Sequence, residues 1–249
     1  MSLLRTSAII LRHYPFSEAD RVLVLLTDRE GKCRALAKGV RRSQSRLAAS
    51  VGLFSLSELQ LHGREHQDLM LVTQGQLVTA YPRLKSDLQA LASAARWSEL
   101  VDRLLPDRQP LPEIFSLLKE ALALLETGLA PLVAGLWFEN RLLDLLGYRP
   151  HLAGCVCCQR SEGPMKYAPD RGGAVCLVCE PAAELPLSPG ARAMLEKIRQ
   201  LPADKVRRLD VLPRVGEEAA AALEAALLYQ LGRTLHSDKF RRAVAGLKG

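Results

Sequence analysis

Short runs of apolar and β-branched residues, separated by polar turns, fill the first eighty positions of the chain. The runs, each bounded by Gly, Asp or Ser, lie at residues 7–12, 21–27, 32–37, 54–61 and 69–77. This pattern predicts five β-strands. The fourth run changes phase at Ser57 and Glu58, which predicts a β-bulge there. Residues 28–31 (Asp-Arg-Glu-Gly) predict a tight hairpin turn, so the second and third strands should be antiparallel neighbours.

Five short strands with a long loop after the third fit a small closed β-barrel. The loop covers residues 39–49 and carries several basic side chains. A barrel of the oligonucleotide-binding type, whose curved face and loops accept single strands, accounts for these features. An SH3-like barrel fits the strand pattern nearly as well.

From residue 84 the apolar residues recur every three or four positions, which is the helical period. The recurrence starts with Leu84, Leu88, Leu91 and Ala95. Further helices are predicted at residues 113–126, 132–146, 188–201 and 215–235. Prolines 112 and 131 stand at predicted first turns, and glycines 128 and 147 follow predicted helix ends. Ser188, followed by Pro189, is the predicted cap of the helix that starts there. We expect the large aromatic side chains of these helices to be core residues: Trp97, Trp137 and Phe138.

Five of the six cysteines lie between residues 155 and 179, and four of them form two spaced pairs. The pairs are Cys155-x-x-Cys158 and Cys176-x-x-Cys179, with seventeen residues between them. Two thiolates on each of two tight turns can converge on one tetrahedral ion, and this spacing is typical of zinc ribbons. Four cysteines close the coordination shell, so we predict a structural Zn²⁺ ion. Disulfides or a bare thiol cluster are the alternatives.

Catalytic alternatives find little support in the sequence. No His-x-Glu segment accompanies the cysteines, as a zinc deaminase requires. The string from His62 to His66 matches inverted zinc peptidases, but its glycine follows a predicted strand and favours a surface turn. A redox Cys-x-x-Cys pair would need a βαβ context, and no Gly-rich loop ends in Gly-Lys-Ser or Gly-Lys-Thr. We therefore expect a non-catalytic protein without a nucleotide cofactor.

The balance of 34 Lys and Arg residues against 27 Asp and Glu residues gives a formal charge of +7, which favours polyanionic partners. Basic residues gather in residues 31–46, which contain no acidic residue, and again near the C-terminus. The candidate contacts with a nucleic-acid backbone are Lys32, Arg34, Lys38, Arg41, Arg42 and Arg46 in the first cluster and Lys239, Arg241 and Arg242 in the second. For the second cluster, a merely solvated surface is the alternative. Stacking aromatic residues are sparse, with Tyr14 and Phe16 in the first turn. Electrostatic contact with the phosphate backbone is therefore favoured over base readout.

Together the elements predict an α+β protein of more than one domain. An oligonucleotide-binding barrel should occupy residues 1–80 and a helical domain residues 81–249, with an inserted zinc-ribbon-like module at residues 148–184. No apolar run approaches the roughly 18 residues of a membrane span, and the start of the chain lacks a signal-peptide layout. We therefore expect a cytoplasmic protein.

Three N-terminal strings resemble the bacterial RecO family of DNA repair proteins. They lie at residues 8–21 (AIILRHYPFSEADR), 25–32 (LLTDREGK) and 37–46 (AKGVRRSQSR). The resemblance extends through the middle helices to the cysteine pairs that follow residues 146–150 (LGYRP), so it covers most of the chain. It implies an N-terminal oligonucleotide-binding barrel, a helical domain and a zinc module.

The resemblance also implies a role in the RecF pathway of recombinational repair. RecO proteins bind single- and double-stranded DNA, anneal complementary strands and work with RecR. With RecR they help to load RecA onto strands coated by single-strand binding protein, in the bacterial cytoplasm at the nucleoid. Some members lack the full set of cysteines, so metal binding here is predicted from this chain's own four.

Two rival interpretations stay open on the residues alone. A zinc-containing adaptor would act only through protein–protein contacts, while its basic loop keeps the surface soluble. A metal-dependent hydrolase would need a catalytic constellation, for which the sequence offers no candidate. Direct binding to bare DNA separates the adaptor from a DNA-binding protein.

Overall fold

The computed structural model describes residues 2–63, 68–183 and 185–246. The chain forms two compact units, the first of Met1–Glu126 with Leu235–Gly249 and the second of Thr127–Thr234. The first unit contains 21 Lys and Arg against 15 Asp and Glu residues, whereas the second contains 13 against 12. Nearly all of the net positive charge therefore belongs to the first unit. The predicted division at residue 80 stays a prediction.

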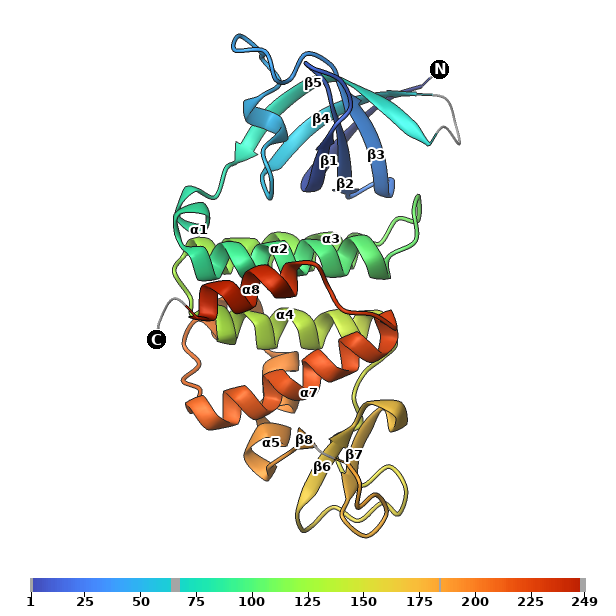
Figure 1. The fold of residues 1–249 in the computed structure, drawn as a ribbon, viewed down its shortest axis with the longest axis vertical. Coiled ribbons are helices and arrows are strands. Elements are labelled where there is room, and N and C mark those ends of the chain that lie inside the picture. The colour runs from blue at the N-terminus through green and yellow to red at the C-terminus, as the bar shows by residue number, and fades with distance from the viewer. Residues whose placement is uncertain (1, 64–67, 184, 247–249) are drawn as a thin grey trace. The chain divides into compact units, whose positions relative to one another are not determined.

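Five strands of the first unit close into a barrel (Figure 1). They are β1 (Ser2–Pro15), β2 (Arg21–Thr27), β3 (Gly31–Ala37), β4 (Leu56–Gly63) and β5 (Leu69–Thr79). The order around the barrel is β1-β2-β3-β5-β4, and β1 pairs with β4 to close it. The contact between β3 and β5 is parallel, and the other pairings are antiparallel. This five-stranded barrel confirms the predicted fold class of the N-terminal region.

Strand β1 is longer than predicted because it belongs to two ladders. Its first half pairs with β4 and its second half with β2, and the register with β2 shifts between Ile10 and Arg12. Such a shift bends a strand, which lets one strand serve both partners. The predicted bulge at Ser57 and Glu58 lies beside an observed register shift between β4 and β5, which falls between Leu56 and Ser57.

Inward-facing side chains of all five strands fill the barrel. The buried cluster includes Ala8, Ile10, Leu23, Leu25, Cys33, Ala35, Leu59, Leu61, Met70 and Val72. The short helix η1 (Ala49–Val51) adds Val51 to this cluster. The predicted turn at residues 28–31 forms, and Gly31 adopts a φ of +67°. A Cβ atom at Gly31 would lie 1.9 Å from the Gln109 carbonyl oxygen, so both conformation and space require glycine there.

Among the described residues, four α-helices complete the first unit: α1 (Pro82–Ser86), α2 (Leu88–Leu104), α3 (Pro112–Glu126) and α8 (Ser237–Gly246). Helix α2 contacts β1, helix α3 contacts β2, and α8 lies along α2 (Figure 1). The Glu99 carboxylate accepts hydrogen bonds from the His236 and Ser237 amides at 2.9 and 2.7 Å, which caps the start of α8. Sequence periodicity did not predict α8, because the buried Arg96–Asp238 ion pair that fixes it joins residues far apart in sequence.

As far as the structure describes it, the second unit combines four α-helices with a small sheet. The helices are α4 (Pro131–Leu145), α5 (Pro189–Gln200), α6 (Ala203–Val206) and α7 (Pro213–Leu231). The sheet has β6 (Met165–Ala168), β7 (Gly173–Cys176) and β8 (Leu185–Pro186), with the short helix η2 (Pro169–Arg171) between β6 and β7. The sheet lies between α4 and α5 in sequence, as the insertion was predicted to do.

The predicted end residues and core residues of the helices are confirmed. Glycines 128 and 147 follow α3 and α4 with positive φ, and the Ser188 hydroxyl accepts from the Ala191 amide at 3.2 Å to cap α5. The large aromatic residues predicted as core, Trp97, Trp137 and Phe138, are at most 1% exposed. Within the described ranges, no helix combines the length and apolar character needed to cross a membrane.

Candidate nucleic-acid interface and metal centre

The basic loop after β3 is fastened to the turn between β1 and β2. The backbone amide of Gly39 donates to the Asp20 carboxylate at 2.7 Å, and the Arg41 amide donates to the Ala19 carbonyl at 3.0 Å. Within the turn, the Phe16 amide donates to the Asp20 carbonyl at 3.1 Å. Two segments separated by about twenty residues of sequence therefore lie side by side at one end of the barrel.

Asp20 is the electrostatic anchor of this junction. The hydrogen bond from Gly39 lowers the pKa of Asp20, and the Ser17 hydroxyl and the charges of Lys38 and Arg42 lower it further against the cost of desolvation. The carboxylate is therefore ionised at neutral pH, and its bond to Gly39 is charge-assisted. The start of the loop is held in place, and the Arg41 guanidinium also donates to the Ser17 carbonyl of the turn at 3.4 Å.

The basic side chains of the loop are available to a ligand. Lys38, Arg41, Arg42 and Arg46 are all exposed, and within the described part of the chain none of them forms an ion pair. Phe16 in the adjacent turn is 60% exposed. Tyr14 is half-exposed, and the Arg12 guanidinium lies 6.0 Å from its ring centre. We call Tyr14, Phe16, Lys38, Arg41, Arg42 and Arg46 the loop–turn surface.

The structure separates Lys32 from the other candidates of the first basic cluster. Lys32 is only 9% exposed, and its ammonium lies 3.0 Å from Asp107 and 3.7 Å from Asp102. Two carboxylates therefore compensate its charge, so it does not fit a contact with phosphate. Sequence could not reveal partners some seventy residues away. Arg34, in contrast, is exposed on β3.

The C-terminal candidates lie on α8, in the same compact unit as the loop–turn surface. Lys239 and Arg242 are exposed, whereas the Arg241 guanidinium lies 3.6 Å from the buried Asp238 carboxylate. A further basic group, absent from the sequence-based candidates, lies in the second unit at Lys205, Arg207 and Arg208, all exposed. Three basic residues within four positions were a visible signal for it.

The two cysteine pairs come together in the second unit. The Sγ atoms of Cys155, Cys158, Cys176 and Cys179 all lie within 4.8 Å of one another. The Cys158 and Cys176 sulfurs are 3.8 Å apart. Sulfurs at the corners of a tetrahedron, about 2.3 Å from a central zinc ion, would be about 3.8 Å apart, so the arrangement fits a metal ion. All six cysteines are free thiols, so the disulfide alternative is not formed.

Backbone hydrogen bonds shape both cysteine turns. The Cys155 amide donates to the Arg160 carbonyl at 2.8 Å, and the Cys179 amide donates to the Cys176 carbonyl at 3.1 Å. Backbone amides, chiefly that of Cys158, lower the pKa of Cys155 to about 6. A thiolate is the form that ligates a metal, so the turns prepare this residue for ligation.

The group of four cysteines has little hydrophobic support of its own. Its buried cluster consists of Cys155, Ala168, Val175 and Cys176. Two of these four residues are ligand candidates, so the apolar core of the module is very small. Cys157 is exposed and is not one of the four grouped thiols. The peptidase-like string ends β4 with His62 and Gly63, and its residues 64–66 lie outside the described residues.

Comparison with known proteins agrees with this architecture along the whole chain. Residues 1–81 match the family model "Recombination protein O N terminal", and residues 85–239 match "Recombination protein O C terminal". The DNA repair protein RecO of Symbiobacterium thermophilum is 37% identical over 96% of this chain and 97% of its own length. That of Anaeromyxobacter sp. (strain K) is 32% identical over the full length of both, and that of Heliobacterium modesticaldum is 38% identical over 90% of this chain and 84% of its own. The chain belongs to the RecO family of DNA repair proteins.

Proposed function

We propose that this protein binds single- and double-stranded DNA through its loop–turn surface. One observation carries the proposal: hydrogen bonds join the basic loop to the turn that exposes Phe16. The basic side chains of this loop are exposed and form no ion pair among the described residues. Basic side chains on a phosphate chain release counterions, and an aromatic face can stack on unpaired bases. Arg34 and the α8 residues Lys239, Arg241 and Arg242 are secondary contacts in this proposal.

The protein's task, in this proposal, is to bring complementary strands together during recombinational repair. Annealing is slow chiefly because two polyanions repel each other, and basic surfaces on one unit screen both strands. Base pairing then supplies the selectivity, and no covalent bond changes. Family membership supports cooperation with RecR, and through it the loading of RecA onto strands coated by single-strand binding protein, in the cytoplasm at the nucleoid.

The cysteine centre has a structural role in this proposal. Cys155, Cys158, Cys176 and Cys179 would hold Zn²⁺, which supplies a cross-link and no open coordination position. Within the module at residues 148–184, a few buried side chains cannot offset the entropy of ordering the chain, and metal binding supplies the missing free energy. The proposal treats the protein as non-catalytic.

Strand annealing at several salt concentrations tests the proposal directly. Full-length protein should bind bare labelled oligonucleotides and accelerate annealing of complementary strands, and both effects should weaken steeply as salt rises. An adaptor that acts only through protein contacts would bind neither strand. Failure to bind bare DNA at low salt would exclude the proposed function.

A further inference from the structure

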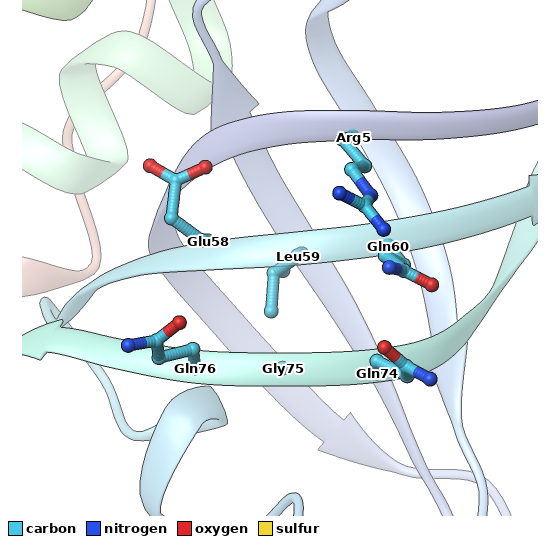
Figure 2. Close-up of a pocket in the computed structure, with 7 residues that line it drawn as sticks. All are labelled: Arg5, Glu58, Leu59, Gln60, Gln74, Gly75 and Gln76. Atoms are coloured by element: carbon cyan, nitrogen blue, oxygen red, sulfur yellow. The ribbon is translucent and has the colours of Figure 1, made fainter.

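The outer face of β1, β4 and β5 carries two parallel rows of polar side chains, on a stretch of the barrel that the loop–turn surface does not include. The strand register places Ser7, Glu58 and Gln76 in one row and Arg5, Gln60 and Gln74 in the other. A hollow of about 410 Å³ lies over the two rows. Figure 2 shows Glu58 and Gln76 on one side of Leu59 and Gly75, with Arg5, Gln60 and Gln74 on the other.

The floor between the rows is bare backbone. Leu59 and Gly75 are paired in the register and lie between the rows, and the Leu59 side chain is buried in the barrel. A Cβ atom at Gly75 would lie 2.3 Å from the Ser50 hydroxyl of η1, so close packing beneath the sheet requires glycine. Neither floor residue therefore fills the space between the two rows.

The spacing of the rows suits a flat ring. Residues two positions apart on a strand are about 6.7 Å apart, which sets the distance between the rows. A base that lies flat over the backbone floor therefore has one row of polar side chains along each of two opposite edges. The terminal amides of Gln60 and Gln76, one in each row, can contact these edges.

The polar groups of the two rows are partly pre-arranged. In the amide orientation that satisfies hydrogen bonding, the Gln60 oxygen accepts from Arg5 Nε at 3.0 Å and its nitrogen donates to Gln74 at 3.3 Å. Glu58 accepts a hydrogen bond from the Ser7 hydroxyl. The amide of Gln76 has no hydrogen-bond partner among the residues that the structure describes.

The charge of the face argues for a base and against a phosphate. Arg5 and Glu58 offset each other, and a carboxylate in the hollow repels a phosphate group. A guanine base presents acceptors on one side and N–H donors on the other, which match an arginine and a carboxylate respectively. Glutamine amides offer both donors and acceptors to a base edge.

From these observations we infer that the face of β1, β4 and β5 is a slot for a single unpaired base, with guanine the base that it fits best. The inference rests on the proposed function, because it adds a base contact to a strand held elsewhere by its phosphates. The slot reads a base, whereas the loop–turn surface holds the backbone. A base held in the slot would fix the position of its strand on the protein, so that the strand meets complementary DNA in a defined position.

Fluorescence anisotropy with full-length protein tests the slot. The probes are labelled oligothymidine strands whose central position is guanine, inosine or an abasic site. Wild-type protein should bind the guanine strand about tenfold more tightly than the abasic strand. The double variant Gln60→Ala/Gln76→Ala should lose this preference without a change in salt dependence, since no phosphate contact is removed. Glu58→Gln should reduce discrimination between guanine and inosine, which lacks the exocyclic amino group.

The control variant Lys38→Ala should weaken binding of all three strands equally and leave their ratio unchanged. Because the substituted side chains lie on the outer face, thermal unfolding of each variant should match that of wild type. Equal affinity of wild-type protein for guanine and abasic strands, or a preference that survives the double variant, overturns the slot alone. Failure to bind any of the strands overturns the proposed function as well.

Discussion

The barrel and the cysteine module solve the problem of a small core in opposite ways. The barrel closes every strand into hydrogen-bonded ladders around an interior built from all five strands. The cysteine module has two short strands, β6 and β7, and four buried cluster residues, two of them cysteines. A domain with a sufficient interior keeps its exposed side chains free for binding, whereas a module without one uses its most reactive side chains to fold.

The charges follow the same division. The barrel unit carries nearly all of the net positive charge, and the unit that contains the cysteines is almost neutral. A zinc module is often taken for the nucleic-acid contact of a protein. We propose that the cysteines stabilise their module and that the barrel unit provides the DNA affinity, and each of the following experiments can contradict this division.

Loss of a metal ligand should have the largest effect. Cys176→Ser removes one thiolate, and structural zinc contributes on the order of 10 kcal/mol to small metal-dependent folds. We expect loss of bound zinc and rapid proteolysis within residues 148–184, measured by metal analysis and by mass spectrometry of the fragments. DNA affinity of the intact variant should stay close to that of wild type.

The exposed Cys157 provides the matched control for that experiment. It lies beside Cys158 but outside the group of four, so Cys157→Ser should retain zinc and resist protease like wild type. If Cys176→Ser abolished DNA binding while the barrel stayed folded, the separation of roles between the two units would be wrong.

Removal of the loop cations should have the next largest effect. The triple variant Lys38→Ala/Arg41→Ala/Arg42→Ala takes away three unpaired charges, so DNA affinity should fall at least tenfold. The slope of log affinity against log salt should become shallower by about two to three. Titrations at several salt concentrations measure both quantities.

The second unit offers a control with the same change of charge. Lys205→Ala/Arg207→Ala/Arg208→Ala also removes three exposed cations, but from the unit that lacks the loop–turn surface. Equal losses of affinity in the two triple variants would show that total charge, and not the loop, governs binding.

Sequence was sufficient where a signal is local. The turn at Gly31, the Ser188 cap and the cysteine spacing each need only neighbouring residues, and all three are confirmed. Binary patterning likewise predicted the five strands, although the ends of β1 depend on two partner strands and were missed. Patterns among neighbouring residues therefore predicted most of the secondary structure.

Sequence was insufficient where a role depends on a distant partner. Lys32 looked like any other basic residue of its cluster, yet Asp102 and Asp107 compensate its charge. Asp20 gave no signal of its contact with Gly39, nineteen positions away. Along β4 and β5 the polar residues of the barrel face stand two positions apart, which is visible in the sequence. Only the strand register shows that they form two rows across the face.

Phe16 tests whether the loop–turn surface contacts bases as well as phosphates. Stacking on an aromatic side chain contributes about 1–3 kcal/mol per base, so Phe16→Ala should weaken single-strand binding about tenfold. Duplex binding and the salt slope should change little, because stacked bases are unavailable in a duplex and no charge is lost. Phe16→Trp should retain single-strand affinity. Equal weakening toward single strands and duplex would indicate a structural role for the ring.

Substitution of Asp20 should have the smallest effect on DNA binding. Its role can be recognised by the pH dependence of amide exchange in the loop. Its pKa is lowered in the folded protein, so its hold on the loop is fully present above its ordinary pKa and is lost as pH falls through the lower folded value. Exchange of the Gly39 amide, relative to its intrinsic rate, should therefore accelerate in that acid range. Asp20→Asn keeps an acceptor oxygen but no charge, so exchange should be faster at neutral pH and should lose the acid step. An acid step that persists in the Asn variant would show that another titratable group, and not Asp20, controls the opening of the Gly39 amide.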